Sequence, residues 1–232
     1  MNYRRQRSVR WPGVLFGVCL ATVACAGQAD RFLDDWLAAQ ARLKTWSAEF
    51  VQTRTLRALR TPIKTPGRLW FAAPDRFRWE LGQPPRTIAL RSREELLVIY
   101  PRLKRAERYT LHPSQTRADA AWVGALTLLD AGFATNRASL EERFQVRAVI
   151  LAEDRAEVLL RPRAAAARRF LTQIRLVIAR RHPGLLANEM RFADGSVIRN
   201  DFTHAKVNPD LPASLFHYIL PSDFKVATPL RP

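Results

Sequence analysis

The residues of this chain best able to ligate a metal or act as a nucleophile are four histidines and two cysteines. They are His112, His182, His204 and His217, with Cys19 and Cys25. No H-x-x-H or H-E-x-x-H spacing joins the histidines, so no helix is predicted to present two of them to one metal. Both cysteines lie in a segment expected to be removed, which leaves the mature chain without a thiol. The sequence therefore predicts no metal site and no cofactor.

Paired carboxylates, another common catalytic arrangement, include the adjacent pairs Glu94-Glu95 and Glu141-Glu142. Neighbouring side chains on a strand point to opposite faces, so these pairs indicate surface charge rather than acid–base catalysis. The chain also lacks G-x-S-x-G, P-loop and G-x-G-x-x-G sequences. These observations indicate that the protein is not an enzyme. A hydrolase whose site has no recognised motif is the remaining alternative from this class.

The first 26 residues have the organisation of a secretory signal peptide. Four arginines precede a mostly apolar run, Trp11 to Ala26, which ends in small residues at Ala24-Cys25-Ala26. A second group of small residues, Gly27-Gln28-Ala29, allows cleavage as late as Ala29. The run is shorter than the roughly 20 residues of a spanning helix, so a membrane anchor is the weaker interpretation. Lipidation of Cys25 is another alternative, although Thr22-Val23-Ala24 lacks the leucine-like residue usual before such a site.

Residues 27–232 are predicted to form a single domain, because no Ser/Gly linker, repeat or change of composition divides them. Their charge is strongly basic. Four of the 38 basic and none of the 21 acidic residues lie in the first 26, which leaves 34 basic against 21 acidic. Export argues against a nucleic-acid partner. The scattered arginines favour a solvated outer face, with attraction to anionic lipid headgroups or to an acidic partner as the alternative.

A site in this chain must be positioned by its secondary-structure elements, and the central stretch of these is Gly67 to Trp79, GRLWFAAPDRFRW. With a period of two, Leu69 and Phe71 share one face of a strand before the Ala72–Asp75 turn. Phe77, Trp79 and Leu81 share one face of the strand after it. An ordinary sheet core is one interpretation of these aromatic residues.

The stretch also resembles the signature of the LolA-like periplasmic outer-membrane lipoprotein carriers. In that family a glycine, an apolar-aromatic strand, a proline and an F-x-W strand follow in order. Upstream, Ser47-Ala48-Glu49-Phe50-Val51-Gln52 resembles the family's S-x-x-F-x-Q strand. Downstream, Gln83-Pro84 and Ile99-Tyr100-Pro101 continue the pattern. Order and spacing agree from about Trp46 to Leu111.

The resemblance implies a mainly β fold, in which a half-open antiparallel barrel, or strongly curved sheet, is covered by helices that act as a lid. It implies a carrier that shields the acyl chains of a lipoprotein or lipid-like cargo. The cargo would come from an inner-membrane exporter or release complex and pass to an outer-membrane acceptor. Family members related to RseB imply a different function, a periplasmic lipid- or lipoprotein-sensing regulator.

The same resemblance implies a hydrophobic cavity and lid, which the apolar side chains of the matching segments would line. These are Trp36, Phe50, Leu69, Phe71, Phe77, Trp79, Leu81, Leu97, Ile99, Trp122, Leu126 and Leu129. One position departs from the family. Its well-known members carry a basic residue before the motif's proline that fastens the lid, whereas Ala72 and Ala73 precede Pro74 here. Arg76 and Arg78 are predicted to point to the other face.

Periodicity predicts the remaining elements. A helix capped by Asp30 carries an apolar stripe from Phe32 to Leu43, and Arg117–Phe133 is a strongly apolar helix that is either buried or gates the site. The Arg60–Pro66 region is expected to be irregular, and Asp194-Gly195 to be a hairpin turn. Strands are predicted at Trp46–Leu56, Arg86–Leu90, Glu94–Tyr100, Lys104–Leu111, Arg143–Leu151, Ala156–Pro162, Phe170–Ala179, Leu186–Ala193 and Ser196–Lys206, and Phe216–Leu220 is expected to close the sheet.

Overall fold

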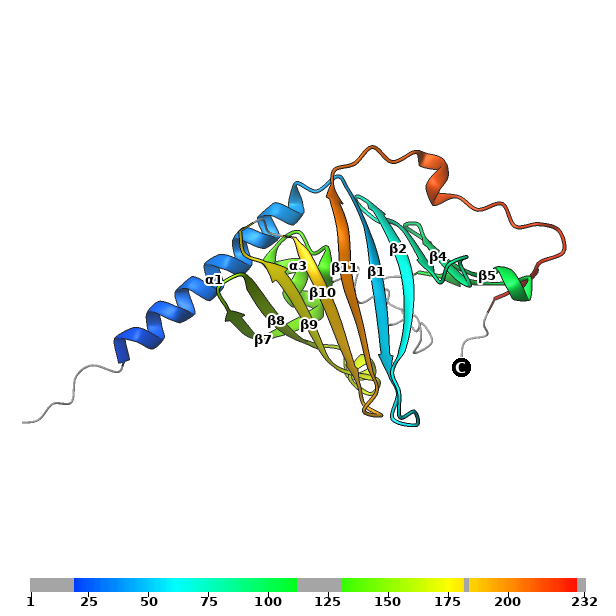
Figure 1. Cartoon of the computed structure of the whole chain (residues 1–232). Helices are drawn as coiled ribbons and strands as arrows, with labels where there is room; N and C mark the ends of the chain where they lie inside the picture. Colours follow the sequence, from blue (N-terminus) through cyan, green and yellow to red (C-terminus); the bar gives the residue numbers. More distant parts are fainter. Residues whose placement is uncertain (1–18, 112–130, 182–183, 229–232) are drawn as a thin grey trace, which may run out of the picture.

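A computed structural model of the protein describes residues 19–111, 131–181 and 184–228, and one curved sheet dominates it (Figure 1). Its strands are β1 Thr45–Thr55, β2 Ile63–Ala72, β3 Arg76–Leu81, β4 Thr87–Arg91, β5 Glu95–Tyr100, β6 Arg105–Thr110, β7 Phe144–Leu151, β8 Arg155–Pro162, β9 Leu171–Ala179, β10 Leu185–Phe192, β11 Val197–Val207 and β12 Lys225–Ala227. Their order in the sheet is β12-β6-β5-β4-β3-β2-β1-β11-β10-β9-β8-β7. The prediction of a mainly β, curved antiparallel sheet is confirmed.

Two meanders make this sheet. The first runs from β1 to β6, and the second starts at the far edge with β7 and returns to pair β11 with β1. All neighbours are antiparallel except β12, which lies parallel to β6. The described helical segments are α1 Cys19–Ala41, α3 Arg137–Arg143 and α4 Ala165–Arg168, with 3-10 turns η1 Pro101–Leu103 and η2 Ala213–Phe216. Among the described residues, no helix is both long and apolar enough to cross a membrane.

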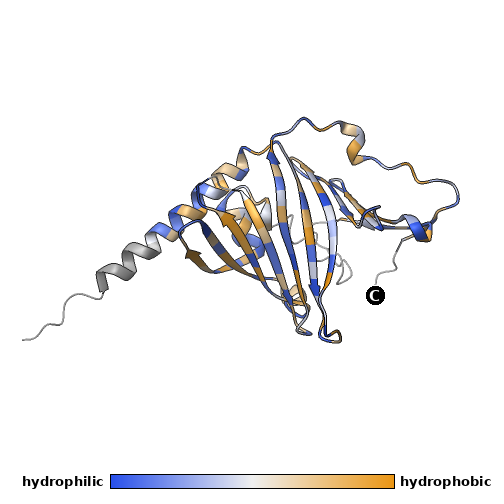
Figure 2. Ribbon diagram, in the orientation of Figure 1, coloured by the Kyte–Doolittle hydropathy of each residue, from blue (hydrophilic) through white to orange (hydrophobic). Residues whose placement is uncertain are grey.

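Hydrophilic and hydrophobic residues alternate along the central strands (Figure 2), and the buried apolar residues are divided between the two faces of the sheet. The inner cluster lies on the face that α1 and α3 cover, and it includes Leu33, Trp36, Leu37, Trp46, Phe50, Leu69, Phe71, Phe77, Trp79, Leu96, Val98, Leu140, Met190 and Phe202. The outer cluster lies on the opposite face and consists of Ile88, Leu90, Leu97, Ile99 and Ala106, with Tyr218, Leu220 and Phe224 packed on it.

The chain after Asn208 forms a strap that runs outside the sheet (Figure 1, orange to red). The prediction that Phe216–Leu220 closes the sheet is wrong: this segment makes no strand, and its side chains pack on the outer cluster instead. Lys225–Ala227 pairs with β6 in its place. Pro212 and Pro221 bracket the misassigned segment, and proline cannot donate to a sheet ladder.

Two further boundaries differ from the sequence-based prediction. Arg60–Pro66 is not wholly irregular, because β2 begins at Ile63 and pairs Lys64 and Thr65 with β1. Asp30 does not cap a helix, since α1 is continuous from Cys19 and passes through it. No proline interrupts the sequence between Cys19 and Ala41, so nothing local starts the helix at Asp30.

Asp30 instead helps to attach α1 to α3. Arg137 of α3 contacts the carboxylates of Asp30 at 3.0 Å and Asp34 at 2.8 Å, and that of Glu141 at 3.3 Å. Hydrogen bonding to Asp34 is the main cause that raises the pKa of the Arg137 guanidinium above its ordinary value, against the opposing desolvation. One cation therefore joins two helices that cover the inner face.

We expect Arg137→Ala to loosen α1 from α3 and to lower the free energy of unfolding by about 1 kcal/mol. The effect is modest because the Arg137 side chain is 32% exposed, and water screens such pairs. Amide hydrogen exchange should become faster along residues 30–41, and the difference from wild type should shrink in 1 M salt. Arg137→Lys, which keeps the charge, is the control. Unchanged exchange in α1 would show that apolar packing alone holds the helix.

Candidate ligand-binding face

The inner face of the central strands is built around a close contact between β1 and β2. Gly67 faces Phe50, and a Cβ at Gly67 would lie 2.1 Å from Cζ of Phe50 and 2.6 Å from the carbonyl oxygen of Glu80. Only glycine leaves room for the Phe50 ring there. The ring lies over the strand and contacts Trp79 of β3, with 4.1 Å between ring centroids.

Aromatic rings continue from this contact toward α1. Phe77 lies 6.0 Å from Trp79, and Trp46 lies 5.4 Å from Phe202, between ring centroids. Phe133 stacks on Phe71 at 4.3 Å. Edge-to-face and stacked pairs of this kind add to the hydrophobic effect of burial. This end of the inner face is therefore an apolar, largely aromatic surface to which β1, β2, β3 and β11 all contribute.

Helix α1 covers part of that surface with one stripe of side chains. Leu33, Trp36 and Leu37 are almost completely buried in the inner cluster. The indole Nε1 of Trp36 is buried and has no hydrogen-bond acceptor among the described residues. An unpaired buried N–H weakens the contact of α1 with the sheet.

A row of polar side chains crosses the inner face beyond the aromatic end. Thr65, Gln52, Asn200 and Asn188 lie opposite one another on β2, β1, β11 and β10. Gln52 Nε2 donates to Asn200 Oδ1 at 3.1 Å, and Asn200 Nδ2 donates to Asn188 Oδ1 at 3.0 Å. Both asparagines are buried. Nδ2 of Asn188 has no acceptor among the described residues, so this polar row ends in an available donor.

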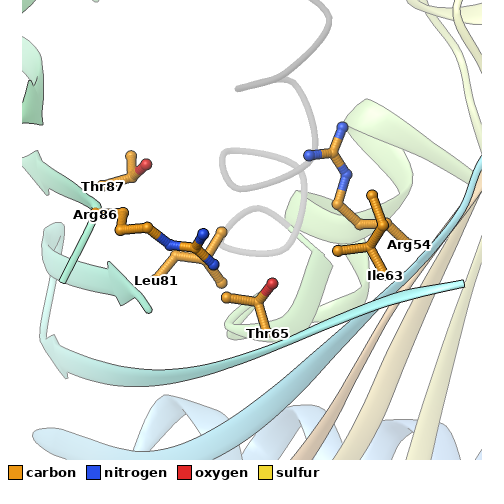
Figure 3. A pocket seen from close by; sticks show the side chains of 6 residues that line it. All are labelled: Arg54, Ile63, Thr65, Leu81, Arg86 and Thr87. Atoms are coloured by element: carbon orange, nitrogen blue, oxygen red, sulfur yellow. The ribbon is translucent and has the colours of Figure 1, made fainter. Parts of the chain in front are cut away.

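A cavity of about 300 Å³ opens beside this row, at the ends of β1 and β3 that lie far from α1. Figure 3 shows the six side chains that line it, which are Arg54, Ile63, Thr65, Leu81, Arg86 and Thr87. Leu81 also packs against the inner cluster. The cavity is therefore continuous with the apolar face through Leu81.

Comparison with known families agrees with this architecture. The sequence profile described as "Outer membrane lipoprotein carrier protein LolA" matches residues 41–219. The chain belongs to the LolA family. A search of curated protein sequences found no match.

Several solved structures are similar to this LolA-family chain. An uncharacterised conserved protein from Thermus thermophilus has 12% identity and a TM-score of 0.49, over 87% of this chain and 99% of that one. A LolA superfamily protein from Nitrosomonas europaea has 11% identity and a TM-score of 0.41, over 80% and 97%. The Pseudomonas aeruginosa MucA/MucB complex matches with 14% identity and a TM-score of 0.46, over 87% of this chain and 64% of that one.

The structure groups seven of the twelve residues that the resemblance to LolA implies. Trp36, Phe50, Leu69, Phe71, Phe77 and Trp79 belong to the inner cluster, and Leu81 packs against it. Trp122, Leu126 and Leu129 lie outside the described residues, as does most of the Arg117–Phe133 segment. Within the described part of that segment, Ala131 is buried and Phe133 packs on the inner cluster.

Leu97 and Ile99 do not lie with the other residues of this set, so the expectation that they line the same cavity is wrong. Both belong to the outer cluster, because β5 turns Leu96 and Val98 to the inner face and their neighbours away from it. Leu96 to Ile99 is an unbroken apolar run with both faces buried, so its period does not reveal which residues face α1.

Arg76 and Arg78 point to the outer face, as their alternation with Phe77 predicts, and they hold the strap. Arg78 Nη1 donates to the carbonyl oxygen of Leu215 at 2.9 Å. The guanidinium of Arg76 lies 5.2 Å from the centroid of the Phe216 ring. Neither arginine therefore points to the inner face, where the resemblance to LolA implies a lid.

The local pattern missed residues that distant strands bring to this face. Phe202 lies opposite Phe50 because β11 returns to β1, and Met190 reaches the inner cluster because β10 in turn pairs with β11. The alternation in 196–206 was the available signal for Phe202. Among the described residues, no group of three or more histidine, cysteine or acidic side chains could hold a metal. His204 contacts Glu49 at 3.2 Å on the surface.

Proposed function

We propose that this LolA-family protein is a periplasmic carrier that shields the acyl chains of a lipoprotein or lipid-like cargo on its inner face. It would receive the cargo from an inner-membrane exporter or release complex and deliver it to an outer-membrane acceptor. The observation that carries this proposal is the apolar inner face, which α1 covers at one end and which meets an open cavity at Leu81. The family's description as a lipoprotein carrier supports it.

The energetic requirement of such a carrier follows from the physics of water. Each methylene kept from water is worth about 0.8 kcal/mol, so a dozen of them contribute roughly 10 kcal/mol. A carrier that binds so strongly must also release its cargo. Protein side chains that occupy the apolar face in the empty state compete with the cargo and weaken binding to a reversible level. The packing of Leu33, Trp36 and Leu37 on that face supplies such competition.

We expect residues 27–232 to bind a fluorescent fatty acyl probe, and Leu81→Gln to weaken the binding about tenfold. Loss of one apolar contact of about 1.4 kcal/mol has this effect. Leu81 is half-buried, so the change should leave the fold intact. The matched control is Leu220→Gln, a half-buried leucine on the outer cluster that should not alter probe affinity. Equal effects of the two changes would contradict an inner-face site.

Cargo and location can be tested on protein taken from cells. Mass spectrometry of organic extracts from the periplasmic protein should identify a bound lipid or lipopeptide. N-terminal sequencing of the same sample should begin between residues 27 and 30. An acylated Cys25 at the N-terminus would contradict a freely diffusing carrier, and an empty protein with esterase activity would favour the hydrolase alternative.

A further inference from the structure

The cavity beside the polar row has a chemical character that acyl shielding does not require. Arg54 and Arg86 enter it from opposite sides, and Figure 3 shows Thr65 between them and Thr87 on the side of Arg86. None of the six lining residues is acidic. Within the described residues, neither arginine has a hydrogen-bond or ion-pair partner for its guanidinium, and Nε of Arg54 is buried without one.

Two unneutralised guanidinium groups in one cavity repel each other, and an anion placed between them removes that cost. Guanidinium groups form two parallel hydrogen bonds with a carboxylate or a phosphate. The threonine hydroxyls can donate to the remaining oxygens. The cavity therefore has the hydrogen-bond donors and the positive charge that an anionic oxygen group needs. No carboxylate among the lining residues competes with such a group.

The position of the cavity connects this anion site to the apolar face. Arg54 lies on the same face of β1 as Phe50, four residues further along, which is about 13 Å at 3.3 Å per residue. The polar row separates the two positions. Leu81 lines the cavity and also packs on the inner cluster, so the two environments share a wall. The inner face thus changes from aromatic to cationic along β1.

We propose that this cavity binds the anionic headgroup of the cargo, a carboxylate or a phosphate, while the acyl chain lies along the apolar inner face. This assignment rests on the proposed carrier function and adds a headgroup preference to it. Arg54 and Arg86 are the specificity-determining residues, and Leu81 marks the junction of headgroup and chain. The protein discriminates between amphiphiles of equal chain length by their charge.

The test compares a charged amphiphile with its neutral twin in competition against the fluorescent acyl probe. The two pairs are a fatty acid with its methyl ester, and a 1-acylglycerol phosphate with the corresponding monoacylglycerol. Wild-type protein should bind at least one anionic member about tenfold more tightly than its twin. Arg54→Gln and Arg86→Gln should each reduce this ratio, and the double variant should bring it near one without changing the affinity for the neutral twin. Arg68→Gln, on the opposite face and paired with Glu49, is the control and should keep the ratio.

The possible results separate the two proposals. Equal affinity for charged and neutral twins in wild type overturns the headgroup assignment and leaves the carrier function standing. Failure of all four amphiphiles to displace the probe overturns the carrier function itself. Inorganic phosphate or acetate that competes as well as the amphiphiles would identify a free-anion site and also overturn the headgroup assignment. A melting temperature close to that of wild type in each variant excludes unfolding as the cause.

Discussion

Gly67→Ala should lower the free energy of unfolding by about 2–3 kcal/mol, and Gly67→Val should lower it further. Alanine normally stabilises a strand relative to glycine by about 0.5–1 kcal/mol, so the sign of the change is diagnostic. The destabilisation is expected because the new Cβ would overlap Cζ of Phe50 at 2.1 Å and the carbonyl oxygen of Glu80 at 2.6 Å. The carbonyl belongs to the sheet and cannot withdraw, so the Phe50 ring must leave Trp79. Chemical denaturation measures the effect directly.

A double-mutant cycle identifies the overlap as the cause. Phe50→Ala removes the ring and leaves only the carbonyl contact, so Gly67→Ala should cost less in that background than in wild type. The coupling between neighbours in contact is expected to reach about 1 kcal/mol or more. Equal costs in the two backgrounds would show that the ring does not need the space over Gly67, and the glycine would then serve the backbone alone.

The part of the inner face that contains Gly67 could be predicted from the sequence. Gly67, Phe77 and Trp79 lie close together in the chain, and their roles depend on strand alternation and one hairpin. Local periodicity is sufficient to place such residues on one face. The face of the first three strands and the turn at Asp194-Gly195, where Gly195 has a φ of 85°, were therefore predictable.

Other parts of the site depend on tertiary structure that a local pattern does not contain. The pairing of β11 with β1 brings Asn200 beside Gln52, 148 residues earlier in the sequence. In the sequence, Arg54 and Arg86 each indicate no more than surface charge. They line one cavity only because the order of β1 to β4 in the sheet brings them together. The Leu96–Ile99 run is apolar on both faces since the strap covers the second one. The strap residues that cover this run lie more than 100 residues further along the chain. The sequence alone therefore does not show which side chains of the run face α1 and which face the strap.

Removal of the strap should produce the largest loss of stability outside the inner face. A chain that ends at Asp210 keeps the bonds that Asn208 and Pro209 make to the start of β1. It loses the contacts of Tyr218, Leu220 and Phe224 with the outer cluster, and the ion pair of Lys104 with Asp223. Three half-buried side chains and the apolar surface beneath them correspond to about 4 kcal/mol. Thermal and urea unfolding should both show this loss.

The same variant tests whether the two faces of the sheet are independent. Truncation exposes Ile88, Leu90, Leu97 and Ile99 to water, so the truncated protein should bind 8-anilinonaphthalene sulfonate more strongly than the full chain. Its affinity for the acyl probe, measured well below its melting temperature, should equal that of wild type because the inner cluster is untouched. Phe224→Ser in the full chain is the milder control and should lower stability by only part of the amount. If truncation abolished acyl binding while the sheet remained folded, the strap would form part of the site, and the cargo would lie between the strap and the outer face of the sheet.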